Sequence, residues 1–301
     1  MKSEIEFLAG LQKKLAIGRG GELVTGIGDD CAIFRPAGSR HDLLFTTDLL
    51  LEDVHFRRET HSPEDVGHKA LARGLSDIAA MGGEPRFCLL SLTVADWADD
   101  RWLNRFYRGL LRLADRTATP LAGGDLARAK TLGCDIVVCG AVPRGKALRR
   151  DGARPGDRIY VSGRLGASAL GLATRGGSAW RKHLRPEPRL ALGQFLRQLG
   201  VNSAMDLSDG LSLDLHRLCL ASGVAARIHA PPVFRGATIE QALHGGEDYE
   251  LLFTARPKTA VPSLWGGVPL TAIGTIEKGP AGALWLGEQR LSPLGYDHFR
   301  P

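Results

Sequence analysis

Short apolar runs alternate with amphipathic stretches along the whole sequence, and this alternation limits the fold more than any other feature. Short apolar runs bounded by polar or glycine-rich turns are typical of strands, and residues 31–34, 43–47 and 87–94 fit this pattern. The other predicted strands are 120–122, 135–142, 158–162, 204–207, 249–254 and 270–276. Because helical stretches lie between them, we predict an α/β (α+β) fold of mixed sheets with helices on one face.

The clearest helix start lies at residues 62–65, which read Ser-Pro-Glu-Asp. Serine is a preferred N-cap, proline fits the first turn, and the two acids lie near the positive end of the helix dipole. Apolar residues then recur at helical spacing until the glycines at 82–83. A second helix is predicted over 102–114.

The polar segment 144–156 separates the two halves of the chain. It contains glycine and ends in the turn sequence Arg154-Pro155-Gly156-Asp157. At 301 residues the chain is long enough for two domains that each bury a core. We therefore predict an N-terminal domain of residues 1–145 and a C-terminal domain of residues 146–301.

The charge distribution argues against nucleic acid as a partner. The formal net charge is +6, but arginines are scattered along the whole chain and the aromatic content is only 6%. A nucleic-acid-binding face needs a longer basic stripe with stacking aromatic side chains. The charge therefore indicates only a weak preference for anionic ligands such as phosphates.

Cysteine usage and hydropathy predict a cytoplasmic protein. The five cysteines lie mostly in apolar runs and form no Cys-x-x-Cys pair, so we expect buried, reduced thiols rather than a zinc site. Residues 3–6 are acidic and predict the start of a helix instead of a signal peptide. No apolar run approaches membrane-spanning length.

Acidic residues recur beside glycine, serine or threonine at the predicted element ends. Each alone is weak evidence for a ligand, because an aspartate beside glycine is more often a turn former or helix cap. Asp209 could cap a helix starting at Gly210, and Asp77 could pair with Arg73 on a helix surface. The segments are Gly28-Asp29-Asp30 before a strand, Thr46-Thr47-Asp48 ending one, Leu75-Ser76-Asp77 in a helix, Gly123-Gly124-Asp125 after a strand, Asp206-Leu207-Ser208-Asp209-Gly210 between a strand and a helix, and Gly245-Gly246-Glu247-Asp248 before a strand.

Taken together, these acids predict a magnesium–nucleotide site. Carboxylates that converge repel one another, which raises their pKa values unless cations neutralise them. Mg²⁺ prefers oxygen ligands and completes its shell with substrate phosphates. The neighbouring glycines would let the backbone approach a triphosphate closely.

The common ATP-binding motifs are missing from the sequence. No Gly-x-x-x-x-Gly-Lys-[Ser/Thr] occurs, which excludes a P-loop. The protein-kinase motifs are missing as well, because Arg40-His41-Asp42 inverts the catalytic-loop order and lacks the downstream asparagine. An ATP-dependent enzyme with this sequence must therefore use another framework.

Seven ordered blocks cover nearly the full chain. They are GIGDDCA (26–32), TTD (46–48) with HF (55–56), HKAL (68–71) with LSDIAAMG (75–82), AGGD (122–125), DLSDGL (206–211), GGEDYEL (245–251) and GYDHF (295–299). In content and order they resemble the thiamine-monophosphate kinases, which belong to the PurM-like ATP-binding superfamily.

This resemblance implies two PurM-like domains, a homodimer formed across the N-terminal sheet, and transfer of the ATP γ-phosphoryl group to thiamine monophosphate. It implies several Mg²⁺ ions held by Asp30, Thr46, Thr47, Asp48, Asp77, Asp125, Asp206 and Asp209. It implies ATP contacts from Tyr107, Gly124, Arg150 and Ser208, and contacts to thiamine monophosphate from His55, Glu247 and Tyr296.

The implied reaction depends on positioning and charge neutralisation. The acceptor is a phosphate oxygen that is already anionic at neutral pH, so no strong general base is required. Bridging metal ions would allow two anionic phosphates to approach each other. We therefore assign no acid–base residue and no phosphorylated histidine, and expect Tyr296 to stack on the cationic thiamine rings.

Two other functions stay open. One is another PurM-like ATP-dependent enzyme, such as an aminoimidazole-ribotide synthetase, although such an enzyme would lack the block at 245–251 as written here. The other is a non-catalytic nucleotide or metal sensor on the same scaffold. Retention of every predicted metal ligand argues against a sensor, and an assay for thiamine diphosphate separates all three.

Overall fold

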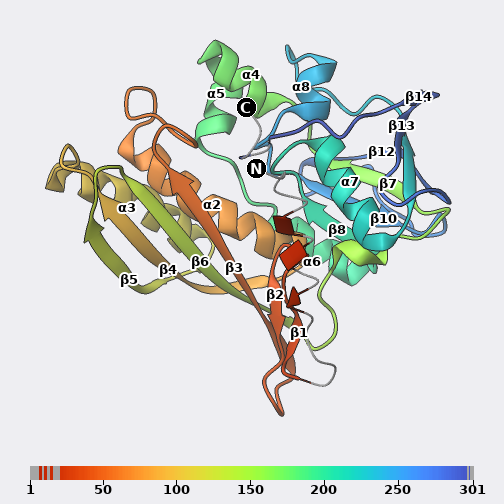
Figure 1. The fold of residues 1–301 in the computed structure, drawn as a ribbon, viewed down its shortest axis with the longest axis horizontal. Coiled ribbons are helices and arrows are strands. Elements are labelled where there is room, and N and C mark those ends of the chain that lie inside the picture. Colours follow the sequence, from red (N-terminus) through yellow and green to blue (C-terminus); the bar gives the residue numbers. More distant parts are fainter. Residues whose placement is uncertain (1–6, 9, 12–13, 16–20, 297, 299–301) are drawn as a thin grey trace.

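Two mixed β-sheets, each with its own helices, organise the chain into two lobes (Figure 1). The computed structural model describes residues 7–8, 10–11, 14–15, 21–296 and 298. The first sheet has six strands in the order β1-β2-β3-β6-β4-β5, and the second has eight, in the order β14-β13-β9-β12-β7-β10-β8 with β11 paired to β12. The predicted α/β architecture with mixed sheets is confirmed. The predicted helix start at 3–6 lies outside the described residues.

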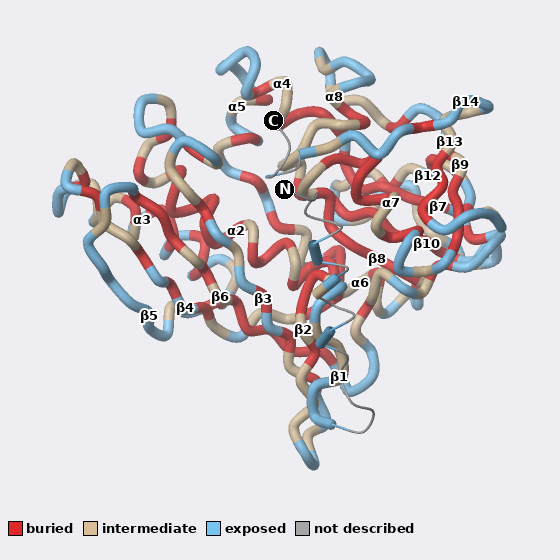
Figure 2. The backbone as a smooth tube through the Cα atoms, in the orientation of Figure 1, coloured by how far each residue is buried: buried red, intermediate tan, exposed pale blue. Residues whose placement is uncertain are grey.

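Helices cover one face of the first sheet, and among the described residues the other face stays open. This sheet is mixed, because β4 and β5 are parallel whereas all other neighbouring strands are antiparallel. The helices pack their apolar sides against the buried face, whereas β5 is exposed along nearly its whole length (Figure 2). The elements are β1 (Leu23–Thr25), β2 (Ala32–Phe34), β3 (His41–Leu51), α2 (Pro63–Ala80), β4 (Glu84–Val94), α3 (Asp100–Arg116), β5 (Leu121–Arg128) and β6 (Gly133–Pro143).

Helix α2 forms where the sequence predicts it. Ser62 is the N-cap, and its side chain and that of Asp65 form a reciprocal capping box. The helix ends before Gly82, which has a φ of 66° and reverses the chain at low steric cost. Its buried residues include Val66 and Leu75, so the predicted apolar face is confirmed.

The second lobe begins after a 3-10 turn, η1 (Arg150–Gly152). Its sheet is covered by helices that pack on a separate hydrophobic core. The strands are β7 (Arg158–Ser162), β8 (Ser203–Asp206), β9 (Ala225–Ile228), β10 (Leu251–Ala255), β11 (Leu264–Trp265), β12 (Val268–Glu277), β13 (Leu284–Leu286) and β14 (Gln289–Arg290). The helices are α4 (Ala167–Thr174), α5 (Gly177–Leu184), α6 (Leu190–Leu199), α7 (Leu211–Ser222) and α8 (Ile239–His244).

Two predicted strand ends are wrong. The sequence 46–48 lies inside β3, because the apolar run 49–51 continues the ladder with β6. The sequence 123–125 lies inside β5, where the glycines are tolerated because β5 is an edge strand. Both acidic segments therefore alternate between two faces of the sheet instead of ending at one edge.

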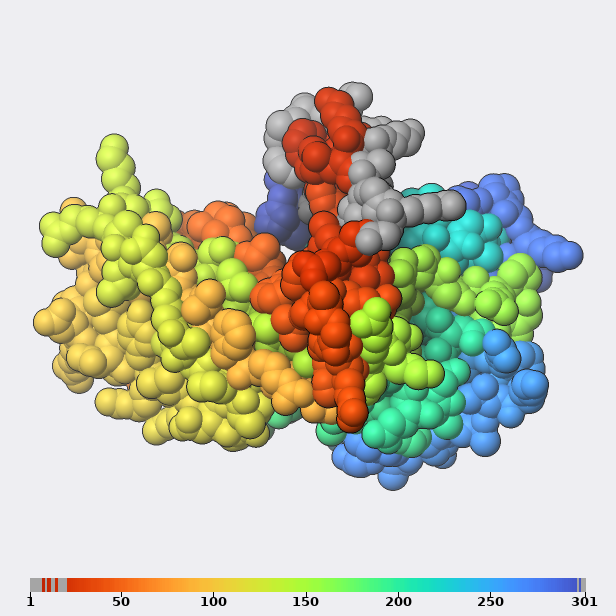
Figure 3. Space-filling view, turned by 90° about the horizontal axis from the view of Figure 1, so that it is seen from below, coloured from red at the N-terminus to blue at the C-terminus, as the bar shows by residue number. Residues whose placement is uncertain are grey.

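Helix α2 joins the lobes. Its C-terminal end packs with α6 and the second sheet in a third hydrophobic cluster that includes Ala79, Leu196 and Phe253. A Cβ at Gly193 of α6 would lie 1.9 Å from the carbonyl oxygen of Ala79, so these helices cross at close range. Figure 3 shows the two lobes on either side of the red N-terminal segment. The boundary between residues 145 and 146 stays a prediction. None of the helices within the described ranges has the length and apolar character to cross a membrane.

Candidate active site

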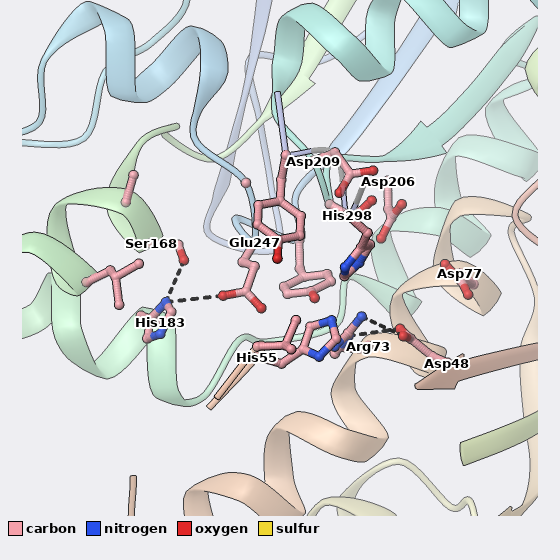
Figure 4. A pocket seen from close by; sticks show the side chains of 17 residues that line it. Asp48, His55, Arg73, Asp77, Ser168, His183, Asp206, Asp209, Glu247 and His298 are labelled. Atoms are coloured by element: carbon pink, nitrogen blue, oxygen red, sulfur yellow. Dashed lines mark hydrogen bonds and ion pairs between the residues drawn. The ribbon is translucent and has the colours of Figure 1, made fainter. Parts of the chain in front are cut away.

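A cavity of about 380 Å³ opens where the two lobes meet along α2 (Figure 4). Its lining comes from β3, α2, α4, α5 and the end of β8, from the segments that follow β3 and β8, from 246–249, and from Tyr296 and His298. Acidic side chains gather at one end, and histidine, tyrosine and apolar side chains gather at the other. The lining includes Asp48, His55, Arg73, Asp77, His183, Asp206, Ser208, Asp209, Glu247, Tyr249, Tyr296 and His298.

Helix α2 supplies three charged side chains at intervals of four residues. Such residues lie above one another on a single helix face. Lys69 Nζ donates to Glu247 Oε2 at 2.8 Å, and Arg73 Nη2 lies 2.6 Å from Asp48 Oδ1. One turn further on, Asp77 Oδ2 accepts from the Thr46 hydroxyl at 2.5 Å.

Three carboxylates from distant parts of the chain converge at the acidic end of the cavity. Asp30 precedes β2, Asp77 lies on α2 and Asp206 ends β8, yet one oxygen from each lies within 4.8 Å of the others. Burial raises the pKa of Asp77 and of Asp206 well above the usual value. The charges of neighbouring acids raise both pKa values further.

The donor set fits a hard divalent cation. Asp30 Oδ2 is buried and has no hydrogen-bond partner among the described residues. Asp206 Oδ2 accepts from the Ser76 hydroxyl at 2.7 Å, and the Arg150 guanidinium pairs with Asp30. One arginine cannot balance three acids, and carboxylate oxygens are the ligands that Mg²⁺ prefers.

Asp48 and Asp209 extend the acidic end, and each is held by an arginine. Asp48 is paired with Arg73, and Asp209 with Arg217, which also lies 3.1 Å from Asp214. Burial raises the pKa of Asp48, although the charge of Arg73 opposes that shift. Asp209 does not cap α7 with its side chain; its backbone N–H instead donates to Asp214 Oδ2 at 3.0 Å.

Glu247 lies at the other end of the cavity. Lys69, whose side chain is fully buried, donates to it, and His183 Nδ1 lies 3.4 Å from the same carboxylate oxygen. His183 Nδ1 is in turn 2.8 Å from the Ser168 hydroxyl. Burial is the largest single influence and works against ionisation of Glu247, but the charges of Lys69, His183 and Arg73 and the hydrogen bond from Lys69 together outweigh it and lower the pKa to about 2. Glu247 is therefore an anion at neutral pH.

The backbone around Glu247 is strained. Glu247 and Tyr249 have φ values of 64° and 49°, in the left-handed region that non-glycine residues seldom adopt. The Glu247 N–H donates to the Ser208 carbonyl at 2.7 Å, which ties this segment to the turn after β8. Asp248, which lies between Glu247 and Tyr249 in the sequence, accepts a hydrogen bond from the Gly166 N–H at 2.5 Å, at the start of α4. The block at 245–251 thus supplies Gly246, Glu247 and Tyr249 to the cavity lining, and Asp248 to the start of α4.

Aromatic rings line the cavity beside Glu247. The rings of His55 and His298 lie 5.2 Å apart, and those of His298 and Tyr296 lie 4.8 Å apart. His55 Nδ1 accepts from the Leu51 N–H at 3.0 Å, which leaves Nε2 as the donor. Burial, reinforced by the charge of Arg73, lowers the pKa of His55 to about 3, so this ring is neutral. Asp297 and Phe299 of the last block lie outside the described residues.

Two predicted metal ligands lie on the open face of the first sheet instead. Thr47 faces away from Thr46 and donates to Asp135 Oδ1 at 2.5 Å. Asp125 is exposed on β5 and accepts from its own neighbour, the Leu126 N–H. The ladder aligns Asp48 with Gly124 across two intervening strands, which separates β3 from β5 by roughly 14 Å. Within one chain, these residues and the acidic cluster do not meet.

The four predicted ATP-binding residues are divided between two regions. Ser208 lines the cavity, and Arg150 lies beside it against Asp30. Tyr107 on α3 is half-buried against the first core, with its ring 5.4 Å from that of Phe106. Gly124 has a φ of 154°, and a Cβ there would lie 1.8 Å from the Leu90 carbonyl oxygen, so sheet packing alone requires glycine.

Sequence reasoning missed several residues that line or support the cavity, among them Lys69, Arg73, Ser168, His183, Tyr249 and His298. The spacing of Lys69, Arg73 and Asp77 was a usable signal, because it places all three on one helix face. The pairing of Arg73 with Asp77 considered from the sequence is not formed; Arg73 pairs with Asp48 because β3 lies alongside α2. Ser168 and His183 gave no local signal.

Comparison with known families agrees with the two-lobe architecture. The family model described as AIR synthase related protein, N-terminal domain, matches residues 28–144. The model described as AIR synthase related protein, C-terminal domain, matches residues 154–287. A structure of the hydrogenase maturation protein HypE in complex with ATP is 18% identical with a TM-score of 0.67, covering 87% of each chain, which shows a shared fold only.

Comparison with individual proteins shows to which family within this fold the chain belongs. The thiamine-monophosphate kinase of Escherichia coli K12 is 40% identical over 92% of this chain and 93% of its own length. That of Bacillus subtilis is 33% identical over 92% of this chain and 94% of its own length. The structure described as AaThiL complexed with AMPPCP and TMP has a TM-score of 0.87 and 32% identity, covering 99% of this chain and 97% of the other. The chain belongs to the thiamine-monophosphate kinase family.

Proposed function

We propose that this protein transfers the γ-phosphoryl group of ATP to thiamine monophosphate and so forms thiamine diphosphate. The observation that carries the proposal is the convergence of the Asp30, Asp77 and Asp206 carboxylates beside a cavity that also contains an ionised glutamate. The relative solved with AMPPCP and TMP, which is similar over 99% of this chain, supports the same pair of substrates.

Magnesium is the cation that fits the acidic end. Asp30, Asp77 and Asp206 would hold it, with Thr46, Asp48 and Asp209 nearby. When bound, Mg²⁺ supplies neutralisation of the charge on the two phosphates. The carboxylates fix its position, while Arg150 and Ser208 lie beside them to contact the nucleotide phosphates.

The opposite end suits the organic part of thiamine monophosphate. Glu247 is held as an anion, and it would face the cationic thiazolium ring or the aminopyrimidine ring of thiamine monophosphate. Tyr296 and the neutral His55 lie beside it and would pack against the rings. This orientation directs the acceptor phosphate toward the acidic end, so the reaction requires positioning rather than a general base.

A homodimer across the open sheet face is part of the proposal. That face carries the exposed apolar side chains of Phe45, Leu49 and Leu89. Pairing of two copies there would cover this surface and bring Asp125 and Thr47 against a second chain, where they could contribute to nucleotide binding. Light scattering is expected to give about twice the 32.4 kDa chain mass; a monomer at micromolar concentration would exclude this interface.

We place the protein in the cytoplasm. Separately, we place the domain boundary between residues 145 and 146. The five cysteines are buried and form no disulfide, which suits a reducing compartment. Fusion to a fluorescent protein would test the location. Separate expression of 1–145 and 146–301 would test the boundary, because a misplaced one would yield unfolded fragments.

A coupled assay tests the activity. The protein is incubated with Mg-ATP and thiamine monophosphate, and thiamine diphosphate is quantified by chromatography. Stoichiometric formation of ADP and thiamine diphosphate is expected. Formation of ADP without thiamine diphosphate would instead favour another PurM-like enzyme, and tight ATP binding without turnover would favour a sensor.

A further inference from the structure

The described residues that line the cavity include several carboxylates but only one arginine. Among its described lining residues no lysine is present, and the permanent cation is Arg73. The acidic side chains are Asp48, Asp77, Asp206, Asp209 and Glu247. An acceptor phosphate that enters this cavity needs a cationic partner of its own, because cations at the acidic cluster must also serve the nucleotide.

Arg73 is incompletely satisfied where it lies. Its Nε donates to Asp48 Oδ2 at 3.0 Å and its Nη2 lies 2.6 Å from Oδ1 (Figure 4). Its Nη1 is buried and finds no hydrogen-bond acceptor among the described residues. A buried guanidinium donor without an acceptor is unfavourable, so a further anionic partner would stabilise this side chain.

Lys69, the neighbouring cation on α2, is not available to bind the acceptor phosphate. Lys69 is fully buried, and its Nζ is occupied by Glu247 at 2.8 Å and by the His55 carbonyl at 3.3 Å. Arg73 lies one helical turn closer to the acidic end and keeps 12% of its side chain exposed. It therefore lies between the anion that would hold the thiamine rings and the cluster that would hold the metal.

Asp48 links Arg73 to metal binding. Both carboxylate oxygens of Asp48 are engaged by Arg73. A divalent cation that binds Asp48 must compete with that ion pair, and its binding would free guanidinium donors for a new acceptor. A phosphate accepts two parallel hydrogen bonds from a guanidinium, which a lysine cannot donate in that geometry.

We propose that Arg73 binds the phosphate of the acceptor, and that it exchanges Asp48 for this phosphate when a divalent cation occupies Asp48. The inference rests on the proposed function, since it takes thiamine monophosphate as the acceptor. It assigns Arg73 the role of a phosphate ligand that distinguishes thiamine monophosphate from unphosphorylated thiamine.

Calorimetric titration of the full-length protein with two ligands tests this role. In buffer with Mg²⁺, Arg73→Met is expected to weaken the binding of thiamine monophosphate by at least about tenfold while leaving thiamine binding unchanged. Methionine retains an apolar stem, and Arg73→Lys should recover only part of the loss. Equal weakening of both ligands would overturn the proposal by indicating a deformed cavity, and undiminished binding of thiamine monophosphate would overturn it directly.

A matched control removes a similar ion pair elsewhere. Arg35 donates to both oxygens of Asp42 at 2.7 and 2.8 Å, and neither residue lines the cavity. Arg35→Met should leave the affinities for both ligands unchanged. A selective loss of thiamine monophosphate binding in this variant would contradict a specific role for Arg73.

Magnesium titrated alone tests the exchange at Asp48. Arg73→Met is expected to bind Mg²⁺ more tightly than the wild-type protein, because the competing guanidinium is gone; equal or weaker binding would overturn the exchange. Failure of the proposed function gives a different result: a wild-type protein that binds Mg-ATP but neither thiamine nor its monophosphate. That outcome would overturn the acceptor assignment and the role of Arg73 together.

Discussion

The two ends of the cavity differ in how their buried carboxylates are neutralised. At one end Asp30, Asp77 and Asp206 face one another, and burial and mutual repulsion raise the pKa values of Asp77 and Asp206. At the other end Glu247 faces Lys69 and keeps a pKa of about 2. The first end needs cations from solution, whereas the second is neutralised by the protein itself. One helix, α2, supplies a residue to each end, so a single element sets the orientation of both substrates.

Removal of one acid at the metal end should have the largest effect. Asp77→Asn removes a carboxylate from the cluster and should lower kcat by about 10²–10³-fold, the range seen when one electrostatic contact to a transition state is lost. The melting temperature should stay equal or rise, because a buried acid among like charges is replaced by a neutral amide. Turnover near the wild-type rate would show that this end does not hold the metal.

Breaking the ion pair at the other end should lower stability. Lys69→Met leaves Glu247 ionised without its partner and should cost up to about 3 kcal/mol, less than for a fully buried pair because Glu247 stays a quarter exposed. Chemical denaturation measures the loss. Adding Glu247→Gln to Lys69→Met should restore most of it, and purely additive losses would contradict the pairing.

Changing Glu247 alone should separate the two substrates. Glu247→Gln keeps the shape but removes the charge, so the KM for thiamine monophosphate should rise about tenfold, as for loss of a charged hydrogen bond. The KM for ATP should stay unchanged. Initial rates with each substrate varied in turn provide the measurement, and a change confined to the KM for ATP would show that Glu247 belongs to the nucleotide site.

The smallest effect on the KM for thiamine monophosphate is expected at Ser168, which reaches Glu247 only through His183. Ser168→Ala removes the hydroxyl that lies 2.8 Å from His183, which in turn lies beside Glu247. The KM for thiamine monophosphate should rise by only a few-fold, as expected from about 1 kcal/mol for one neutral hydrogen bond. An effect as large as that of Glu247→Gln would mean that His183 or Ser168 contacts the acceptor itself.

The sequence was sufficient for most of the fold because its local signals are strong. The start of α2 follows from the N-cap serine, the proline and the two acids at 62–65, and its end from the glycines at 82–83. Strand β7 was predicted with its observed ends. Short strands such as β9 and β14 were missed, because four residues or fewer give too little periodicity to recognise.

The site could be predicted only as a set of residues, without its geometry. The acids at 30, 77 and 206 were among the residues that the sequence predicted to converge, but so was Asp125, which lies on the open face of the first sheet. That Thr47 turns away from Thr46 follows from strand alternation, once β3 is known to continue past residue 48. The contacts of Arg73 and Lys69 required the tertiary structure, since Asp48 and Glu247 lie on other elements.

The account depends most directly on cations at the Asp30, Asp77 and Asp206 cluster. Anomalous diffraction from crystals grown with Mn²⁺ and a non-hydrolysable ATP analogue would locate them, since Mn²⁺ accepts the same oxygen ligands as Mg²⁺. We expect an anomalous peak within coordination distance of the Asp77 and Asp206 carboxylates, next to the nucleotide phosphates. Bound nucleotide with no peak at these carboxylates would contradict the account.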